Sequence, residues 1–385
     1  MPTHATPPDR LPPLRRHAAG GRASTRLIAA GLVSILLAGC ATTAPSASPR
    51  AAVVSPTIAP TPTPSPTPTV APTPTPTPAP VGPNADLTGL PADPSLAHRL
   101  PLAVMIDDSR AARPQSGFNA AAIVYQAPAD GYETRYMLVF QERDTKEVGP
   151  VRSARFYLTQ WASELRAAIA HYGGDRRTRR HIKYNPQMFT DVDGLGRGNK
   201  AYHRIKSRKA PHNAYGSTAS IRKMALKLGA AKTLSSKLHV RPFIDPVPLD
   251  QRGESQRIRI PYRTNVITYR YDRASDRYLR SINGKAHIDP ADDERVAPTN
   301  VVVLFQKFRI DTKIEPGHSR PDIKTLGKGD ALVFREGRVT KATWKKSGDT
   351  APTLIVDADG QEIPLVRGQT FIQVVPLDTK VTYKD

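Results

Sequence analysis

Two arginines stand at the start of a predicted helix, in the stretch Gly149–Arg155, which reads GPVRSAR. The Gly-Pro pair interrupts the preceding strand pattern, and Ser153 is the expected N-cap of a helix over Phe156–Leu165. Free N–H groups and the positive end of a helix dipole favour an anion at such a place. We therefore predict an anion site that includes Arg152. The alternative is that the arginines are solvated or paired with neighbouring acids.

Other polar side chains fall at expected strand ends, turns and helix starts, where sites on α/β scaffolds gather. An arginine-rich cleft built from them would bind a phosphate or a carboxylate, because each guanidinium offers a planar fork of donors. The residues expected to bind the ligand are Arg113, Arg135, Arg152, Ser153, Arg155, Lys209 and Asn213.

A carboxylate and two histidines offer a different chemistry, general acid–base catalysis. Asp107 would orient an arginine or act as a base, and His171 or His212 would transfer a proton, because imidazole titrates near neutral pH. The alternatives are a turn acceptor for Asp107 and hydrogen-bonded structural roles for the histidines. No Gly-x-Ser-x-Gly motif surrounds Ser153, which disfavours a hydrolytic triad.

The sequence predicts neither a metal site nor a cofactor. The segment 191–194, Asp-Val-Asp-Gly, is similar to the start of a calcium loop, but Tyr202 stands where the bidentate glutamate belongs. The histidines at 171, 203 and 212 lack the i,i+4 spacing of zinc ligands.

The only cysteine, Cys40, follows Leu-Ala-Gly at the end of an apolar run over Leu27–Ala38. Arginines precede the run, which is too short to span a bilayer, so residues 1–40 have the pattern of an export signal. The sequence around Cys40 resembles the bacterial lipobox. That resemblance implies lipidation of Cys40 and an anchor that holds the protein outside the cytoplasm. The alternative is an ordinary signal peptide with a chance cysteine.

The chain is strongly basic, with 56 Lys and Arg against 34 Asp and Glu and a formal net charge of +22. Such a balance favours acidic partners. We expect no nucleic acid, because the densest basic cluster, within 176–183, has no RNA-binding aromatic signature beside it. The expected partners are the membrane, through the anchor on Cys40, and an anionic cell-wall polymer or peptide.

Composition divides the rest of the chain into three parts. Residues 41–95 form a Pro/Thr-rich linker, for which we expect extended, disordered conformations. Residues 96–235 are predicted to form a mixed α/β domain. Its elements include a buried strand over Leu102–Ile106, a helix capped by Asp175 and a helix opened by Ser217.

The third part, residues 245–378, is predicted to be a β-rich domain, because short alternating segments are joined there by turn signals. The expected strands are Arg257–Tyr262, Asn265–Tyr271, Arg277–Arg280, Asn300–Phe308, Ala331–Phe334, Arg338–Trp344, Thr353–Val356 and Thr370–Val375.

Several of these segments, in this order, resemble one bacterial family, the YerB-like lipoproteins. The resemblance is carried by Pro101–Asp107, Ala112–Gly117, Gly149–Arg155 and Arg208–Asn213 in the first half, and by Asn300–Val303, Gly329–Ala331 and Pro364–Thr370 in the second. It implies a surface lipoprotein with an N-terminal and a C-terminal YerB domain. The family has no assigned reaction, so the resemblance carries over no catalytic residue.

Three functions remain open on these observations. The first is a lipoprotein that binds an anionic cell-envelope ligand through the arginine- and lysine-rich cleft, and we favour it because basic residues abound. The second is an envelope hydrolase or transferase that uses His171 or His212 with Asp107. The third is a non-catalytic scaffold for a protein partner.

Overall fold

The computed structural model describes residues 82–235, 238–315 and 317–384, which all belong to one compact unit. The predicted signal peptide 1–40, the lipidation site Cys40 and the linker up to residue 81 lie outside the described residues. Across the described ranges, no helix is both long and apolar enough to cross a membrane.

The helices all lie in the first half of the described chain. They are α1 (Pro94–Ala97), α2 (Phe156–Glu164), α3 (Arg176–Tyr184) and α4 (Thr218–Lys227), with short 3-10 turns at η1 (Arg110–Ala112), η2 (Asp130–Tyr132), η3 (Asn199–Ala201) and, later, η4 (Leu249–Gln251). The strands of this half are β1 (Leu102–Asp107), β2 (Ile123–Pro128), β3 (Thr134–Phe140), β4 (Ala168–His171), β5 (Thr190–Asp193), β6 (Tyr202–Arg204) and β7 (Ala214–Gly216).

Apart from η4, the regular elements of the second half are strands. They are β8 (Phe243–Ile244), β9 (Arg257–Pro261), β10 (Val266–Asp272), β11 (Arg277–Ile282), β12 (Lys285–Ala286), β13 (Ile288–Asp289), β14 (Glu294–Arg295), β15 (Asn300–Gln306), β16 (Phe308–Glu315), β17 (His318–Ile323), β18 (Gly327–Arg335), β19 (Arg338–Lys346), β20 (Leu354–Val356), β21 (Leu365–Val366), β22 (Thr370–Pro376) and β23 (Thr382–Lys384). The coarse prediction of a strand-rich fold with its few helices in the first half is confirmed.

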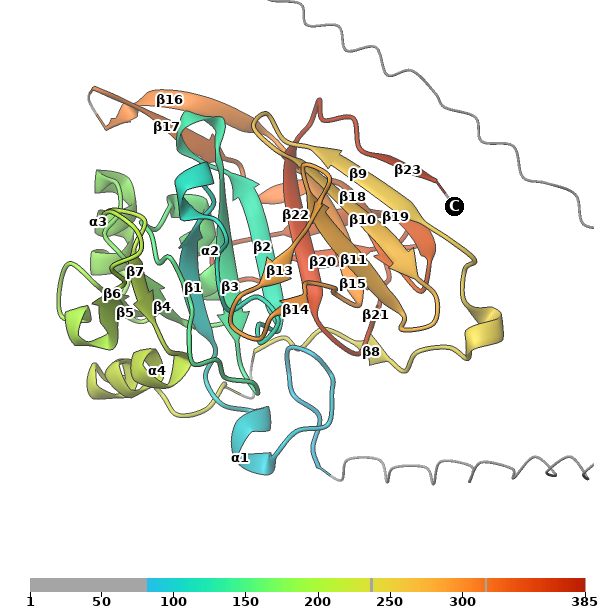
Figure 1. Ribbon diagram of the computed structural model, residues 1–385, viewed down its shortest axis with the longest axis horizontal. Coiled ribbons are helices and arrows are strands. Elements are labelled where there is room, and N and C mark those ends of the chain that lie inside the picture. The colour runs from blue at the N-terminus through green and yellow to red at the C-terminus, as the bar shows by residue number, and fades with distance from the viewer. Residues whose placement is uncertain (1–81, 236–237, 316, 385) are drawn as a thin grey trace, which may run out of the picture. The chain divides into compact units, whose positions relative to one another are not determined.

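One large sheet takes strands from both halves, in the order β20-β19-β18-β15-β22-β2-β3-β1-β4-β5 (Figure 1). Its middle strand, β22, is parallel to β15 on one side and to β2 on the other. Phe371 of β22 stands opposite Val301 in β15 and Val124 in β2. The two predicted domains, 96–235 and 245–378, are therefore joined by continuous backbone hydrogen bonding.

The central strands of the large sheet, among them β1, β3 and β22, are buried on both faces, which explains why β1 reads as an unbroken apolar run. Alternate β1 residues point into different cores: Leu102, Val104 and Ile106 into one, Ala103 and Met105 into the other. Helix α4 and the five-stranded sheet β12-β11-β10-β9-β23 contribute to the first core. Helices α2 and α3 contribute to the second.

Two local predictions are corrected by the structure. Residues 82–95, assigned to the disordered linker, are folded: Ala85 and Leu87 are buried, and the N–H of Ala85 donates to the carbonyl of Leu90. Ser153 does not cap α2. The N-cap is Arg155, without a side-chain hydrogen bond, and the Ser153 hydroxyl donates instead to the carbonyl of Tyr172 at 2.9 Å.

Candidate functional site

The segment 150–154 enters the large sheet between the carboxyl ends of β1 and β4. These strands pair directly only over 102–104 and 168–170. Beyond that point the N–H of Asp107 donates to the carbonyl of Pro150, and the N–H of Tyr172 donates to the carbonyl of Arg152, both at 3.0 Å. The carboxyl ends of two parallel strands are thus held apart, which is where sites form on open α/β sheets.

Asp107 is the centre of the polar cluster at this opening. Its Oδ2 lies 2.7 Å from Nδ1 of His212 and 3.3 Å from Nε of Arg152. Its Oδ1 accepts a hydrogen bond from the N–H of Ser109 at 3.1 Å. Arg135 stands directly opposite Asp107 in the antiparallel register of β1 and β3. The structure therefore brings one carboxylate, two guanidinium groups and one imidazole together.

Asp107 is ionised in this setting, although it is only 3 % exposed. Burial alone would raise its pKa, but the charge of Arg135, the hydrogen bonds from Ser109 and His212, and the charge of Arg152 together lower it. An ionised carboxylate only accepts hydrogen bonds, so the N–H that lies between Asp107 and His212 belongs to Nδ1 of the histidine. That leaves Nε2 of His212 without a partner among the described residues.

The two arginines are held in different ways. Arg135 is buried, donates to the carbonyl of Ser153 at 2.7 Å, and keeps a buried Nε atom that has no partner. Nε of Arg152 forms an ion pair with Asp107 but makes no hydrogen bond, the side chain is 30 % exposed, and no described residue bonds to its Nη atoms. Burial lowers the pKa of both groups, and the charge of Asp107 opposes that effect. Arg152 and His212 thus meet at Oδ2 of Asp107, and each keeps nitrogen atoms that no described residue uses.

Arg113 and Arg155 do not join this cluster. Arg113 forms a salt bridge with Asp108 at 2.8 Å and donates to the side chain of Asn265 at 2.9 Å. Asp108 follows Asp107 in the chain, but its side chain accepts hydrogen bonds from Gln126 and Thr134, whose side chains do not contact Asp107. Arg155 is paired with Asp130. The alternative recognised from the sequence, arginines paired with neighbouring acids, therefore applies to both residues.

His171 belongs to a separate cluster at the end of β4. Its Nε2 lies 2.8 Å from Asp191, its Nδ1 lies 2.8 Å from the carbonyl of Gly173, and the ring is 1 % exposed. Burial would lower its pKa, but the hydrogen bond to Asp191 and the charges of Asp191 and Asp193 raise it. Of the two histidines considered as proton carriers, only His212 contacts Asp107.

Lys209 and Asn213 lie in the loop that carries His212. The carbonyl of Lys209 accepts a hydrogen bond from the N–H of His212 at 3.0 Å, and its side chain is exposed. Asn213 bonds to the carbonyls of Ile205 and Arg208, so its side chain fixes the loop. The sequence did not single out Ser109, whose hydroxyl lies 3.2 Å from Nδ1 of His212. The signal for Ser109 was its place in the Asp-Asp-Ser turn that follows β1.

Family models match both halves of the chain. Residues 87–231 match "Protein of unknown function (DUF3048) N-terminal domain", and residues 258–372 match the corresponding C-terminal domain. The chain is 31 % identical over 297 residues to a protein of Bacillus subtilis (strain 168) named "Putative lipoprotein YerB", which covers 76 % of this chain and 86 % of the relative.

A solved structure shows the same fold. The crystal structure of YerB protein from Bacillus subtilis superposes with a TM-score of 0.68 at 30 % identity, over 78 % of this chain and 99 % of that one. The fold and the paired domain models define a class of strand-rich proteins with no assigned function. This chain belongs to the YerB-like family.

Proposed function

We propose that this protein is an extracytoplasmic lipoprotein, anchored through Cys40, that binds an anionic cell-envelope ligand beside Asp107. The name of the relative from Bacillus subtilis supports the anchor, together with the lipobox-like sequence at Cys40. The ligand is an anionic wall polymer or a peptide carboxylate. Its binding groups are the Nη atoms of Arg152 and Nε2 of His212. The buried guanidinium of Arg135 adds positive charge to the site.

The observation that carries the proposal is the geometry around Asp107. One buried carboxylate forms an ion pair with Nε of Arg152 and a hydrogen bond with Nδ1 of His212, while the Nη atoms of Arg152 and Nε2 of His212 have no partner among the described residues. A fork of donors fixed in this way loses little side-chain entropy when it binds an oxyanion. With two guanidinium groups against one carboxylate, the cluster keeps an excess of positive charge.

A hydrolase or transferase is the second candidate, and the contact between Asp107 and His212 favours it. A carboxylate that accepts from Nδ1 holds imidazole in the tautomer whose Nε2 can take a proton. In that function His212 is the general base, Asp107 orients it, and Arg152 binds the anionic substrate.

The two functions are separated by the variants Arg152→Gln and His212→Asn of the full chain, assayed with synthetic poly(glycerol phosphate). Binding is measured by calorimetry at low and high salt, and turnover by release of glycerol phosphate. We expect Arg152→Gln to weaken binding about tenfold, the loss typical of a charged hydrogen bond, and to reduce its salt dependence. Loss of turnover in His212→Asn with binding retained would establish the enzyme.

Arg257→Gln is the matched control, because Arg257 is an exposed arginine of β9 that contributes nothing to the Asp107 cluster. It should bind like the wild type. The anion-binding proposal fails if Arg152→Gln and Arg257→Gln bind the polymer equally well. It also fails if the wild type shows no binding at low salt to this polymer or to a peptide with a free carboxylate.

A further inference from the structure

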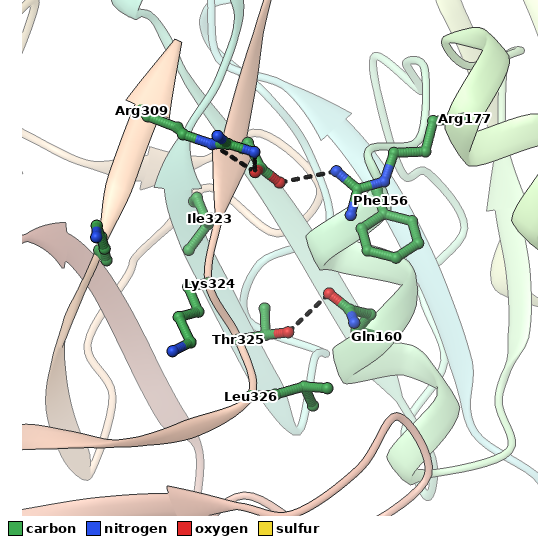
Figure 2. A pocket seen from close by; sticks show the side chains of 10 residues that line it. Phe156, Gln160, Arg177, Arg309, Ile323, Lys324, Thr325 and Leu326 are labelled. Atoms are coloured by element: carbon green, nitrogen blue, oxygen red, sulfur yellow. Dashed lines mark hydrogen bonds and ion pairs between the residues drawn. The ribbon is translucent and has the colours of Figure 1, made fainter. Parts of the chain in front are cut away.

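A cavity outside the Asp107 cluster lies where the hairpin β16–β17 faces helices α2 and α3 (Figure 2). Its volume is about 470 Å³. It shares no residue with the cluster of Asp107, Arg135, Arg152 and His212. Its lining consists of Phe156, Gln160, Arg177, Lys307, Arg309, Asp322, Ile323, Lys324, Thr325 and Leu326.

The lining of this cavity carries more positive than negative side chains. Asp322 is its only carboxylate, and it is shared by Arg177 and Arg309, each 2.8 Å away. Lys307 and Lys324 line the same cavity, and neither ammonium group bonds to a described residue. The lining thus carries four cationic side chains and one carboxylate, and Arg309 also pairs with Asp311 outside the lining at 3.1 Å.

The hairpin places the backbones of the two lysines side by side. The N–H of Lys324 donates to the carbonyl of Lys307 at 2.9 Å, directly beyond the last registered pair of β16 and β17. Opposite residues of an antiparallel pair project from the same face. Both lysine side chains are exposed, and an anion bound at this point of the hairpin would be attracted by both charges.

The rest of the cavity is apolar or fully bonded. The guanidinium of Arg177 lies over the ring of Phe156, 3.6 Å from its centroid, which fixes both groups (Figure 2). Leu326 and Ile323 add aliphatic surface. At the far side, Thr325 donates to Gln160 at 2.7 Å, and Gln160 donates to Asp349, so these polar groups are already satisfied.

From the unpaired lysines and the apolar wall beside them, we infer that this cavity binds a small organic anion: a phosphate or carboxylate attached to a ring or another apolar group. Lys307 and Lys324 bind the charged end, and Arg309 lies beside them on the same face of the hairpin. Phe156, Ile323 and Leu326 contact the apolar end. This site is independent of the function proposed for the Asp107 cluster.

The test is titration calorimetry on the full chain with phenyl phosphate and with benzoate, compared with inorganic phosphate. We expect saturable binding of at least one aromatic anion, and weaker binding of inorganic phosphate, which lacks the apolar part. The double variant K307Q/K324Q should bind about tenfold more weakly or worse, because it loses two charged contacts.

The matched control is K223Q/K227Q, which removes two exposed lysines from α4 and changes the net charge equally. It should bind like the wild type, and so should His212→Asn, whose change lies in the other cluster. The inference is overturned if neither aromatic anion binds, if both lysine variants lose affinity equally, or if inorganic phosphate binds as tightly as phenyl phosphate.

Discussion

His171 and His212 are both held by aspartates, but only His212 keeps a ring nitrogen that no described residue uses. His171 is enclosed, and both of its ring nitrogens are bonded, to Asp191 and to the carbonyl of Gly173. His212 bonds to Asp107 through Nδ1 alone, and its side chain is 24 % exposed. The difference arises from position: His171 ends a strand inside the sheet, whereas His212 lies in the loop before β7. A histidine with both nitrogens bonded has no atom left for proton transfer.

The raised pKa of His171 makes a contribution to stability that depends on pH. The folded state holds a proton that the unfolded chain releases near the ordinary histidine value of 6.5. This stabilisation is therefore fully present below that pH and is lost as the pH rises through the folded-state pKa. We expect the free energy of unfolding to fall as the pH rises above about 6.5 more steeply in the wild type than in His171→Gln.

Urea denaturation at a series of pH values checks this expectation. His203→Gln is the control, because His203 is an exposed histidine of β6. It should show the pH dependence of the wild type. Equal slopes in His171→Gln and in the wild type would mean that Asp191 does not hold the proton on His171.

Among the elements, α3 shows how a local signal fixes a helix that carries charge. Asp175 accepts from the N–H of Thr178 at 2.9 Å and from its hydroxyl at 2.7 Å, so the first turn of the helix is closed. The helix that follows is dense in arginine, and its Arg177 reaches Phe156 and Asp322. The cap therefore positions one wall of the cavity beside the hairpin β16–β17.

Asp175→Ala should lower the free energy of unfolding by about 1 kcal/mol, the usual cost of losing an N-cap, with the negative charge at the helix start lost as well. Thermal and urea denaturation measure the change. Asp175→Asn is the conservative comparison, because asparagine caps helices well. It should recover most of the loss. If the alanine and asparagine variants are equally unstable, the cap is not the source of the effect.

Signals that act within a few residues were readable from the sequence, and signals that depend on distant strands were not. The caps at Asp175 and Ser217 were predicted and are confirmed, because each acceptor lies three residues from its donor. Ser153 was predicted as a cap and is not one, since residues 150–154 bond to β1 and to 172–173 instead.

The hairpin β16–β17 was not predicted, although Phe308, Ile310 and Ile314 alternate as in a strand and Gly317 marks a turn. The charged residues that break this pattern concealed it. The candidate site likewise combines residues that the sequence identified with contacts that only the structure shows. Asp107, Arg152 and His212 were identified by residue type, but only the pairing of β1 with Pro150–Arg152 shows that they meet and that Arg113 and Arg155 do not.

At the scale of the whole described molecule, the two halves are joined by more than the large sheet. Arg280 of β11 is fully buried and donates to Gln126 of β2 at 2.7 Å and to the hydroxyl of Tyr136 in β3 at 3.0 Å. It also bonds to His287 at 2.6 Å. Burial and the charge of Arg280 lower the pKa of His287 well below its ordinary value, so the ring is neutral and accepts this bond.

We therefore expect both halves to unfold in one transition. The chain contains two tryptophans, and each reports on a different half: Trp161 is buried in α2, and Trp344 is buried in β19. The variants Trp344→Phe and Trp161→Phe each leave one reporter. In both variants, the urea transition monitored by tryptophan fluorescence should have the same midpoint as the transition monitored by far-ultraviolet circular dichroism. A cooperative unit gives the same midpoint with every probe.

Comparing the two probes within one variant removes the effect of the substitution itself, since fluorescence and dichroism then report on the same protein. Independent unfolding would require the hydrogen bonds between β22 and β2 to break while each half stayed folded. That would expose a row of paired backbone groups and the apolar faces around Val124 and Phe371, both of which are fully buried. A fluorescence midpoint displaced from the dichroism midpoint in either variant would show that the shared sheet does not couple the halves.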